Sequence, residues 1–405
     1  MRRFFRTLAL TLCAALTMSF VSCSSGSSDS EENPGTTAVT TESPENVAVT
    51  TYTVTFDCDG GNSVESQTVE SGKTATKPAD PTKKEGKTSF AFLGWYNGDT
   101  IFDFASEIKG EITLKAKWME GFAKVTGTTI KGDETWIPES DVFVSGRSLT
   151  IGDLYVCDHE VTQSEYTKYC KYGSESPNGT YGFGYNYPAY YVNWYDAVVY
   201  CNLRSMDEGL TPCYTLGEET DPSKWSGILS TTTGDVTKYC GLSRQSSAWD
   251  GGIIMNTTAN GYRLPTEAEW EYIAREGKTS GTTYSGSNTI GDVAWYGKNS
   301  GSKSHEVKSD KVSGTDSANA LGIYDMSGNV WEWCWDWCWH WNSTVNSDTG
   351  ASGESSGDYR VRRGASWINI ADWCEVAYRY NYYQYDRLSD RINDVGFRVV
   401  RSSSN

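Results

Sequence analysis

Residues 325–341 read DMSGNVWEWCWDWCWHW, and this stretch decides the fold. Tryptophan occupies every second position from Trp331 to Trp341, so an extended strand places all six indoles on one face. The opposite face then carries Glu332, Cys334, Asp336, Cys338 and His340. Because a row of indoles presents a large apolar area, we expect this strand to pack against the core of a domain.

The turn before the strand, from Asp325 to Asn329, places oxygen-rich groups beside Glu332. Two interpretations fit these residues. In the first, an aromatic core strand simply follows a Gly/Asn turn. In the second, the turn is a calcium loop, because Asp and Glu carboxylates together with freed backbone carbonyls are the ligands that a hard cation requires.

Six motifs follow one another along the chain. They are DHEVTQSEY at 158–166, YYVNWYDAVVYCN at 190–202, GYRLPTEAEWEYIAREG at 261–277, NALGIYDMSGNVWEW at 319–333, RRGASW at 362–367 and DVGFRVVR at 394–401. Together they resemble the signatures of the formylglycine-generating enzyme family, also called the sulfatase-modifying factor family. The resemblance implies an α+β domain with a C-type-lectin-like fold and many long loops, which we assign to residues 136–402.

Three amphipathic helices are expected inside this domain. Thr162 with Glu165, and Thr266 with Glu269, are capping-box patterns, and Asn193 is expected to cap another helix. The expected ends of the three helices are at Gly173, Gly209 and Gly277.

The chain has 405 residues and a formal net charge of −17 at pH 7. This charge argues against nucleic acid and against an anionic membrane surface as partners. Of the 11 cysteines, Cys13 lies in the expected signal peptide and Cys23 at the expected lipidation site, which leaves nine. An odd number in a large domain indicates buried thiols rather than a disulfide scaffold.

The N-terminus has the organisation of a targeting segment. Three arginines precede an apolar stretch at 8–20 that is too short to span a bilayer, and Cys23 follows. This resembles a bacterial lipoprotein signal, with residues 1–22 removed and Cys23 lipidated; the alternative is an ordinary secretory signal with an incidental cysteine. Residues 23–49 are polar and form the expected flexible tether. The resemblance implies export and lipid anchoring at the bacterial cell envelope, at the outer membrane or cell surface, with the N-terminal lipid as the only membrane contact.

Residues 50–118 are expected to form a β-rich module. Tyr52, Val54 and Phe56 alternate with polar residues and predict its first strand. The run YTVTFDCDGG…FLGWYNG…FDF…ITLKAKW resembles the internalin B-repeat family, or Listeria–Bacteroides repeat. The resemblance implies a small β-grasp-like module that serves as a spacer or adhesion unit. Residues 119–135 are expected to be a linker.

Enzymatic activity is in doubt because of one position. Active formylglycine-generating enzymes oxidise a peptide cysteine with copper held by two cysteines five residues apart. The resemblance aligns Cys374 with the second cysteine and Asn369 with the first. A cuprous ion prefers two thiolates, and an amide oxygen does not replace one. We therefore expect no oxidase activity; the alternative is a formylglycine-generating oxidase that acts on exported sulfatases, with Cys374 catalytic and copper as cofactor.

The same resemblance implies a structural calcium site. It would use the side chains of Asp325 and Glu332 and the backbone carbonyls of Gly328 and Val330. All four positions are chemically competent for calcium, so we expect one calcium ion there.

Residues 367–395 combine many tyrosines with Asn, Asp and Ile. This composition is typical of binding paratopes, where rigid rings supply contact area and short polar groups adapt. The segment resembles the variable region of treponemal variable proteins, lipoproteins of this fold in which Asn codons are diversified; the alternative is a fixed loop in a catalytically inactive family member. The residues expected to contact a ligand are Trp367, Asn369, Trp373, Tyr378, Tyr380, Tyr382, Tyr383, Tyr385 and Asn393.

These observations predict a lipid-anchored surface protein whose large domain is a non-catalytic binding module. Its partner is expected to be a protein or peptide ligand held on residues 367–393.

Overall fold

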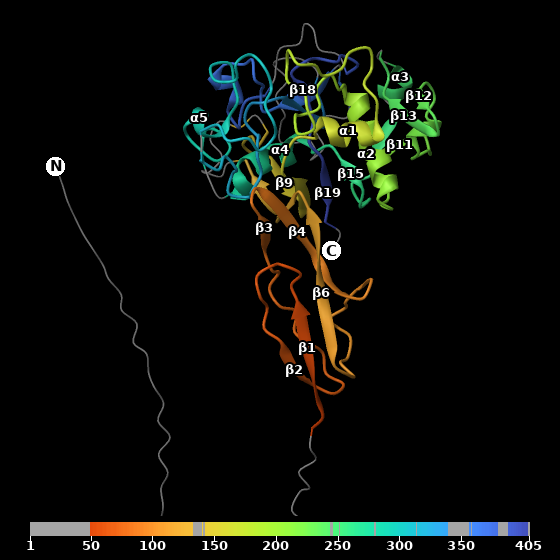
Figure 1. Ribbon diagram of the computed structural model, residues 1–405, viewed down its shortest axis with the longest axis vertical. Helices are drawn as coiled ribbons and strands as arrows, with labels where there is room; N and C mark the ends of the chain where they lie inside the picture. Colours follow the sequence, from red (N-terminus) through yellow and green to blue (C-terminus); the bar gives the residue numbers. More distant parts are fainter. Residues whose placement is uncertain are drawn as a thin grey trace, which may run out of the picture. The chain divides into compact units, whose positions relative to one another are not determined.

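The computed structural model describes residues 49–132, 140, 142–243, 246–250, 252–278, 281–312, 314–338, 356–357, 359–379 and 388–403. The expected signal peptide, Cys23 and all but the last residue of the expected tether lie outside this part of the chain. In the part described, no helix is long and apolar enough to cross a membrane. A small β-sheet module comes first in the described sequence, and a larger α+β domain follows it (Figure 1).

The module is one mixed sheet. In spatial order its strands are β2 (Gln67–Glu70), β1 (Thr51–Asp57), β6 (Ile112–Glu120), β4 (Thr88–Asn97) and β3 (Lys83–Glu85), and β5 (Thr100–Ile101) pairs with β4. β1 and β6 run parallel, whereas the other pairs are antiparallel. The expected alternation of the first strand is confirmed, because Val54 and Phe56 are buried, and the ring centroids of Phe56 and Trp95 lie 4.8 Å apart.

Residues 119–132, the described part of the expected linker at 119–135, belong to paired strands and their connections, which corrects the expectation from the sequence. β7 (Phe122–Val125) pairs antiparallel with β10 (Leu154–Cys157), and β8 (Thr128–Lys131) pairs with β9 (Ser148–Ile151). The larger domain therefore begins directly after β6. Each of these strands has four residues and pairs outside its own neighbourhood, so the local pattern was too short to reveal it.

Short strands in small sheets make up the β structure of the larger domain. One sheet has the order β15 (Tyr262–Arg263), β19 (Val400–Ser402), β10, β7, and another has β17 (Tyr359–Arg363), β16 (Trp331–Cys338), β18 (Val395–Gly396). The remaining pairs are β11 (Tyr214–Leu216) with β14 (Ile253–Met255) and β12 (Leu229–Thr233) with β13 (Val236–Cys240).

The α-helices are short, apart from α2. They are α1 (Gln163–Tyr169), α2 (Trp194–Asp207), α3 (Ser247–Asp250), α4 (Glu267–Ala274) and α5 (Ile290–Val293). Single 3₁₀ turns form η1 (Pro222–Lys224), η2 (Glu276–Lys278) and η3 (Ala371–Cys374).

The three predicted helix starts are confirmed. Thr162, Asn193 and Thr266 each accept a hydrogen bond from the third backbone N–H of their helix, and each forms a complete capping box. The first helix ends at Tyr169, before the expected Gly173, because Cys170 is extended and forms a bridge with Tyr239.

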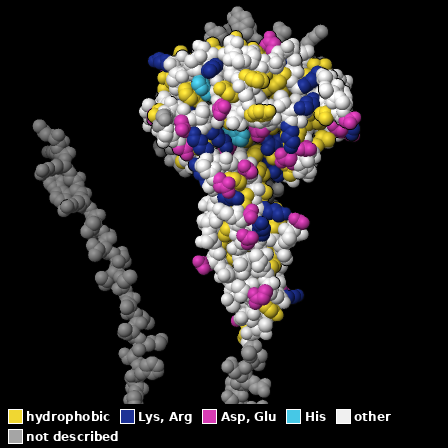
Figure 2. Space-filling model, in the orientation of Figure 1, with side chains coloured by type: hydrophobic (Ala, Val, Ile, Leu, Met, Phe, Trp, Pro, Cys, Tyr) yellow, Lys and Arg dark blue, Asp and Glu magenta, His cyan; other side chains and the backbone are white. Residues whose placement is uncertain are grey.

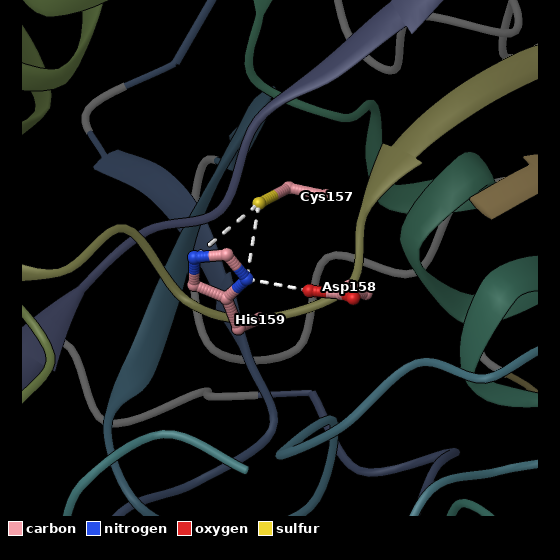
Figure 3. Close-up of side chains that lie close together, drawn as sticks. All are labelled: Cys157, Asp158 and His159. Carbon is pink, nitrogen blue, oxygen red and sulfur yellow. Dashed lines mark hydrogen bonds and ion pairs between the residues drawn. The ribbon is translucent and has the colours of Figure 1, made fainter. Parts of the chain in front are cut away.

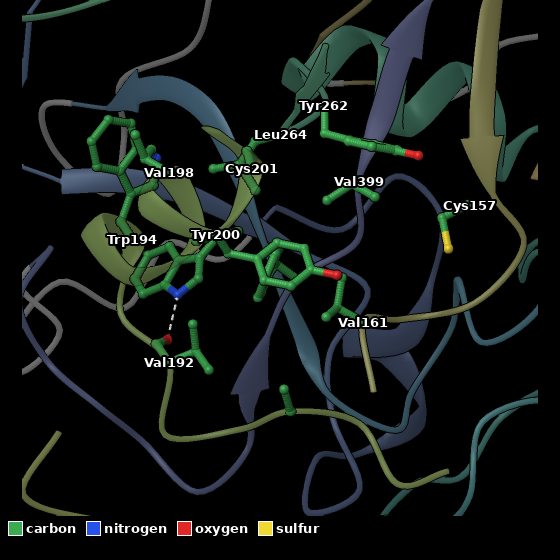
Figure 4. Packing of buried hydrophobic residues seen from close by; sticks show 14 of the residues in the cluster. Cys157, Val161, Val192, Trp194, Val198, Tyr200, Cys201, Tyr262, Leu264 and Val399 are labelled. Carbon is green, nitrogen blue, oxygen red and sulfur yellow. Dashed lines mark hydrogen bonds between the residues drawn. The ribbon is translucent and has the colours of Figure 1, made fainter. Parts of the chain in front are cut away.

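Strand β16 is buried on both faces, whereas the sequence predicted packing of its tryptophan face only. Trp331, Trp333 and Trp337 join a core cluster that also contains most of α2, whereas Cys334 joins a second cluster with α4. Figure 4 shows the first cluster, in which residues of α2 lie among side chains near β10, β15 and β19. The end of the tryptophan run, at residues 339–341, lies outside the described part.

The cysteines behave as expected from their number. All nine that follow Cys23 lie in the described part as free thiols, and eight of them are buried.

Candidate functional site

The turn at 325–330 is locked into the core by its backbone. Asp325, Gly328 and Asn329 have positive φ angles of 58°, 82° and 61°. A Cβ on Gly328 would lie 2.3 Å from the carbonyl oxygen of Trp295, so only glycine fits there. The Asn329 amide donates to Glu160 Oε2 at 2.6 Å and accepts the backbone N–H of His305 at 2.9 Å. The turn therefore has one conformation, held from several elements.

Glu332 is fully buried beside this turn and is saturated by donors. Arg398 donates to both of its oxygens, at 2.7 and 2.6 Å, and the indole N–H of Trp270 donates to Oε2 at 2.7 Å. Both side chains of the Glu332–Arg398 pair have no exposure. A bidentate pair of this kind fixes the carboxylate in place.

Asp325 is also paired with a cation of the chain itself. Its carboxylate binds the ammonium group of Lys311, and the backbone N–H of Lys308 donates to Oδ2 at 2.8 Å. The side chains of Asp325 and Lys311 are both fully buried.

The predicted calcium ligands therefore do not fit a calcium site as the structure arranges them. The carboxylates of Asp325 and Glu332 hold a lysine and an arginine, respectively. That leaves the two predicted carbonyl oxygens, of Gly328 and Val330, which are too few for calcium. Calcium needs six or more oxygens directed at one point, and here the acidic oxygens are directed at nitrogen donors.

Cys374 is buried and has the properties of a core thiol. Its Sγ lies 3.7 Å from the carbonyl oxygen of Ile370, and burial raises the pKa of the thiol to about 12. At neutral pH the thiol is therefore protonated, whereas metal binding and nucleophilic attack require the thiolate.

Asn369, at the aligned first-cysteine position, is part of a turn. Its Oδ1 accepts the backbone N–H and the hydroxyl of Ser366, at 2.8 and 2.7 Å. Its carbonyl accepts the N–H of Gly297 at 2.8 Å. The side-chain oxygen of Asn369 is thus used inside the turn, and the contact of this residue with a ligand stays a prediction.

The same turn separates buried from exposed side chains. Trp367 is 2% exposed and stacks on Tyr181, so the prediction that it contacts ligand is wrong for this conformation. Ile368 and Ile370 on either side of Asn369 are 58% and 61% exposed. Hydrophobic side chains also reach the surface elsewhere on the larger domain (Figure 2).

Two other predicted contact residues form a half-buried aromatic pair. Trp373 and Tyr378 stack with ring centroids 5.6 Å apart and an interplanar angle of 13°. Burial raises the pKa of Tyr378 to about 12. Asn393 is half-buried, and its carbonyl accepts the indole N–H of Trp367 at 3.4 Å.

Four predicted contact residues cannot be placed. Tyr380, Tyr382, Tyr383 and Tyr385 lie outside the described residues. Near the predicted contact segment, Ile368 and Ile370 are exposed and Trp373 and Tyr378 are half-buried, and we call these four residues the 368–378 face.

One group of potential metal ligands occurs within the described residues, at the end of β10. It consists of Cys157, Asp158 and His159 (Figure 3). The His159 ring nitrogens face Asp158 Oδ1 at 2.5 Å and Glu165 Oε2 at 3.2 Å. Burial lowers the pKa of His159, but Cys157, Glu165 and the hydrogen bond with Asp158 outweigh it and raise the pKa well above its ordinary value.

With a carboxylate on each side, the protonated imidazole forms two ion pairs, and in that form the group is an ion cluster. Asp158 also binds Lys308 Nζ at 2.5 Å and accepts the backbone N–H of Ser89, from β4, at 2.9 Å. The cluster therefore ties the module to the larger domain.

Sequence reasoning missed Ile368 and Ile370 as exposed residues, and Lys311 as a core residue. The position of the isoleucines on each side of a polar Asn was a usable signal. Lys311 had none, because a single lysine in a polar loop normally faces solvent.

Both parts of the chain match known families. Residues 120–403 match the sulfatase-modifying factor enzyme 1-like domain, and residues 52–117 match the Listeria-Bacteroides repeat domain. The predicted α+β, formylglycine-generating-enzyme type of fold is thereby confirmed, as is the repeat module.

Three similar proteins illustrate the match. Chaperone protein LppX of Paenibacillus barcinonensis is 34% identical over 296 residues, which cover 68% of this chain and 92% of that protein. Treponema denticola variable protein 1 aligns with a TM-score of 0.51 and 28% identity, covering 71% of this chain and 96% of that chain. Inactive C-alpha-formylglycine-generating enzyme 2 of Mus musculus is 37% identical over 123 residues, which cover 28% of this chain and only 33% of that protein.

Proposed function

The chain belongs to the sulfatase-modifying factor enzyme 1-like domain family, and from this premise we propose that its larger domain is a non-catalytic module that binds a polypeptide ligand on the 368–378 face. The ligand is a protein or peptide segment that offers apolar side chains.

One observation carries this proposal: Ile368 and Ile370 are exposed on a turn that is itself rigid. The Ser366–Asn369 hydrogen bonds hold the turn, and Asn369 is anchored to Gly297. Apolar side chains on a rigid support lose little entropy when a partner covers them. Half-buried Trp373 and Tyr378 supply aromatic area of the kind found at the centres of interfaces.

The chemistry of Cys374 supports the absence of oxidase activity. Its thiol is protonated at neutral pH because burial raises its pKa to about 12. The other aligned position offers Asn369, whose oxygen is already used by Ser366. The copper chemistry of active relatives needs two thiolates, and these two residues do not supply them.

The names of similar proteins support binding rather than catalysis. One is called a chaperone, one a variable protein and one an inactive enzyme. A chaperone binds polypeptides through apolar surface, which is the chemistry of Ile368 and Ile370.

We further propose that the protein is exported and anchored through lipid on Cys23. The basic, apolar and cysteine-containing order of the first residues supports this. Metabolic labelling with a fatty-acid analogue tests it: we expect label on the full chain and none on Cys23→Ser, and equal labelling of both would refute it.

We also propose that residues 367–395 are diversified between related copies of the gene. The Asn-, Asp-, Tyr- and Ile-rich composition supports this, as does the similarity to a variable protein. Sequencing the gene from independent isolates is the test. Identical segments in all isolates, with no near-copy of the coding region beside a reverse transcriptase, would contradict it.

The binding proposal is tested with a permanently unfolded polypeptide, reduced and carboxymethylated α-lactalbumin. We expect the purified chain to bind it, and Ile368→Ser/Ile370→Ser to weaken binding roughly 100-fold or more, since each buried Ile side chain contributes about 1.5–3 kcal/mol. Leu229→Ser/Val236→Ser is the matched control, because these residues are 38% and 56% exposed on the β12–β13 ribbon. Equal weakening by both double variants would refute a specific face.

The enzymatic alternative has its own test. The chain is loaded with copper and incubated with a CxPxR peptide, and the product is analysed by mass spectrometry. We expect no formylglycine. Formylglycine that disappears in Cys374→Ser would overturn the proposal.

A further inference from the structure

A buried positive charge contacts the turn that precedes β16, where the sequence predicted a metal ion. Lys311 lies 14 residues before Asp325, and the two side chains meet with no exposure of either. The ammonium group also donates to the Ser309 carbonyl oxygen at 3.1 Å. It lies 5.9 Å from the ring centroid of Trp295, the residue whose carbonyl faces Gly328.

This arrangement resembles a cation site in which the ammonium group of Lys311 is the cation. A carboxylate and a backbone carbonyl oxygen converge on one positive centre, as they do around calcium. An ammonium group has three N–H donors and needs acceptors on one side only, whereas calcium needs six to eight oxygens all round it. The indole face of Trp295 is a suitable neighbour for an ammonium group.

The second acidic group of the predicted calcium site is neutralised in the same way. Glu332 receives both N–H arms that Arg398 directs at it. Asp325 and Glu332 thus each have their own cation from the chain. The third buried carboxyl here, Glu160, accepts the Asn329 amide and the Val330 N–H, and burial raises its pKa well above its ordinary value, which favours the neutral form.

We propose that the ammonium group of Lys311 takes the place of a bound calcium ion in this turn, so that the fold is held by an internal cation and is independent of calcium. This inference concerns the stability of the domain and does not depend on the proposed ligand binding.

The wild-type chain gives the first test. Its thermal unfolding temperature is measured in chelator and in millimolar calcium, and its metal content is determined after purification in calcium. We expect the two temperatures to agree within about one degree and no stoichiometric calcium. A calcium-dependent rise of several degrees that Asp325→Asn abolishes would overturn the proposal.

Removal of the ammonium group gives the second test. Lys311→Ala leaves the Asp325 carboxylate without its cation, so we expect a lower unfolding temperature in chelator and a partial recovery in calcium. The double variant Lys311→Ala/Asp325→Asn should lose that recovery. Lys298→Ala, at an exposed lysine nearby, is the matched control and should behave as the wild type.

Two results of this second test would refute the proposal. One is Lys311→Ala with unchanged stability, and the other is a loss of stability that calcium does not restore. If Lys311→Ala does not fold, Lys311→Met keeps the aliphatic volume, and the wild-type measurement decides the matter independently.

Discussion

Two neighbouring turns of the larger domain are both fixed by polar contacts, but they direct their side chains differently. The framework turn, by which we mean residues 325–330 and the first two residues of β16, directs Asp325 and Glu332 inward, where Lys311 and Arg398 neutralise them. The turn at 366–370 is also fixed by hydrogen bonds, yet it directs Ile368 and Ile370 to solvent. The two are joined, because Asn329 accepts the backbone N–H of Trp367 at 2.8 Å. The difference shows how the turn at 366–370 gains rigidity from a neighbouring turn whose own charged groups are paired.

The largest expected effect comes from breaking the buried pair of the framework turn. Arg398→Met leaves the Glu332 carboxylate buried without its cation, which should lower the free energy of unfolding by about 3–5 kcal/mol. Urea denaturation measures this. Glu332→Gln/Arg398→Met should cost clearly less than the sum of the two single changes. Simple additivity would show that the pair does not act as a unit.

Backbone strain in the same turn gives the next effect. Gly328→Ala should destabilise the domain by about 2–3 kcal/mol, because it combines a positive φ with a 2.3 Å approach to the Trp295 carbonyl. Gly301→Ala is the control, since Gly301 has φ 64° and open space around its Cβ position. It should cost about 1 kcal/mol from the φ angle alone. Equal losses of stability in the two variants would show that the close approach to the Trp295 carbonyl has no effect.

The ion cluster of His159 lies outside both turns. Its contribution to the free energy of unfolding can be tested by measuring stability as a function of pH. The pKa of His159 is raised by the folded state, so its stabilising contribution is complete below the ordinary value of 6.5 and is lost as the pH rises through the folded-state value. At pH 6, His159→Gln should cost about 1–3 kcal/mol, the contribution of hydrogen bonds to charged groups. The difference in unfolding free energy between wild type and variant should shrink toward alkaline pH. If this difference in unfolding free energy grew with pH, His159 would not be positively charged in the folded state.

Changes of the exposed side chains in the turn at 366–370 should have the smallest effect on stability. Ile370→Ser removes a side chain that is 61% exposed, so the free energy of unfolding should change by less than about 0.5 kcal/mol. Trp367→Ala, three positions earlier, removes a buried ring and should cost about 3–5 kcal/mol. Comparable losses at both positions would mean that Ile370 packs within the fold and does not present an apolar surface.

Features set by neighbouring residues could be predicted from the sequence. The capping boxes of α1 and α4 each need only two residues three apart, and both are present. The packing of the tryptophan face of β16 follows from strand alternation alone.

Features set by distant partners could not be predicted. β7 is recognisable only through its pairing with β10, and Lys311 is a core residue only because Asp325 lies against it. Likewise, Trp367 faces inward because Tyr181 and Asn393 receive it, and neither is near it in sequence. Composition predicted an aromatic surface, but it could not separate the buried ring from the exposed isoleucines.

The parallel pairing of β1 and β6 gives the module a mechanical property. The chain enters β1 at Thr51 and leaves β6 toward the larger domain, so the entry and exit points lie at opposite ends of the paired segment. Tension between them pulls the two strands past each other lengthwise. The residue pairs from Val54–Ile112 to Asp57–Lys115 then bear the force together, so their hydrogen bonds do not break one after another. The module should therefore resist stretching more strongly than a hairpin of equal length.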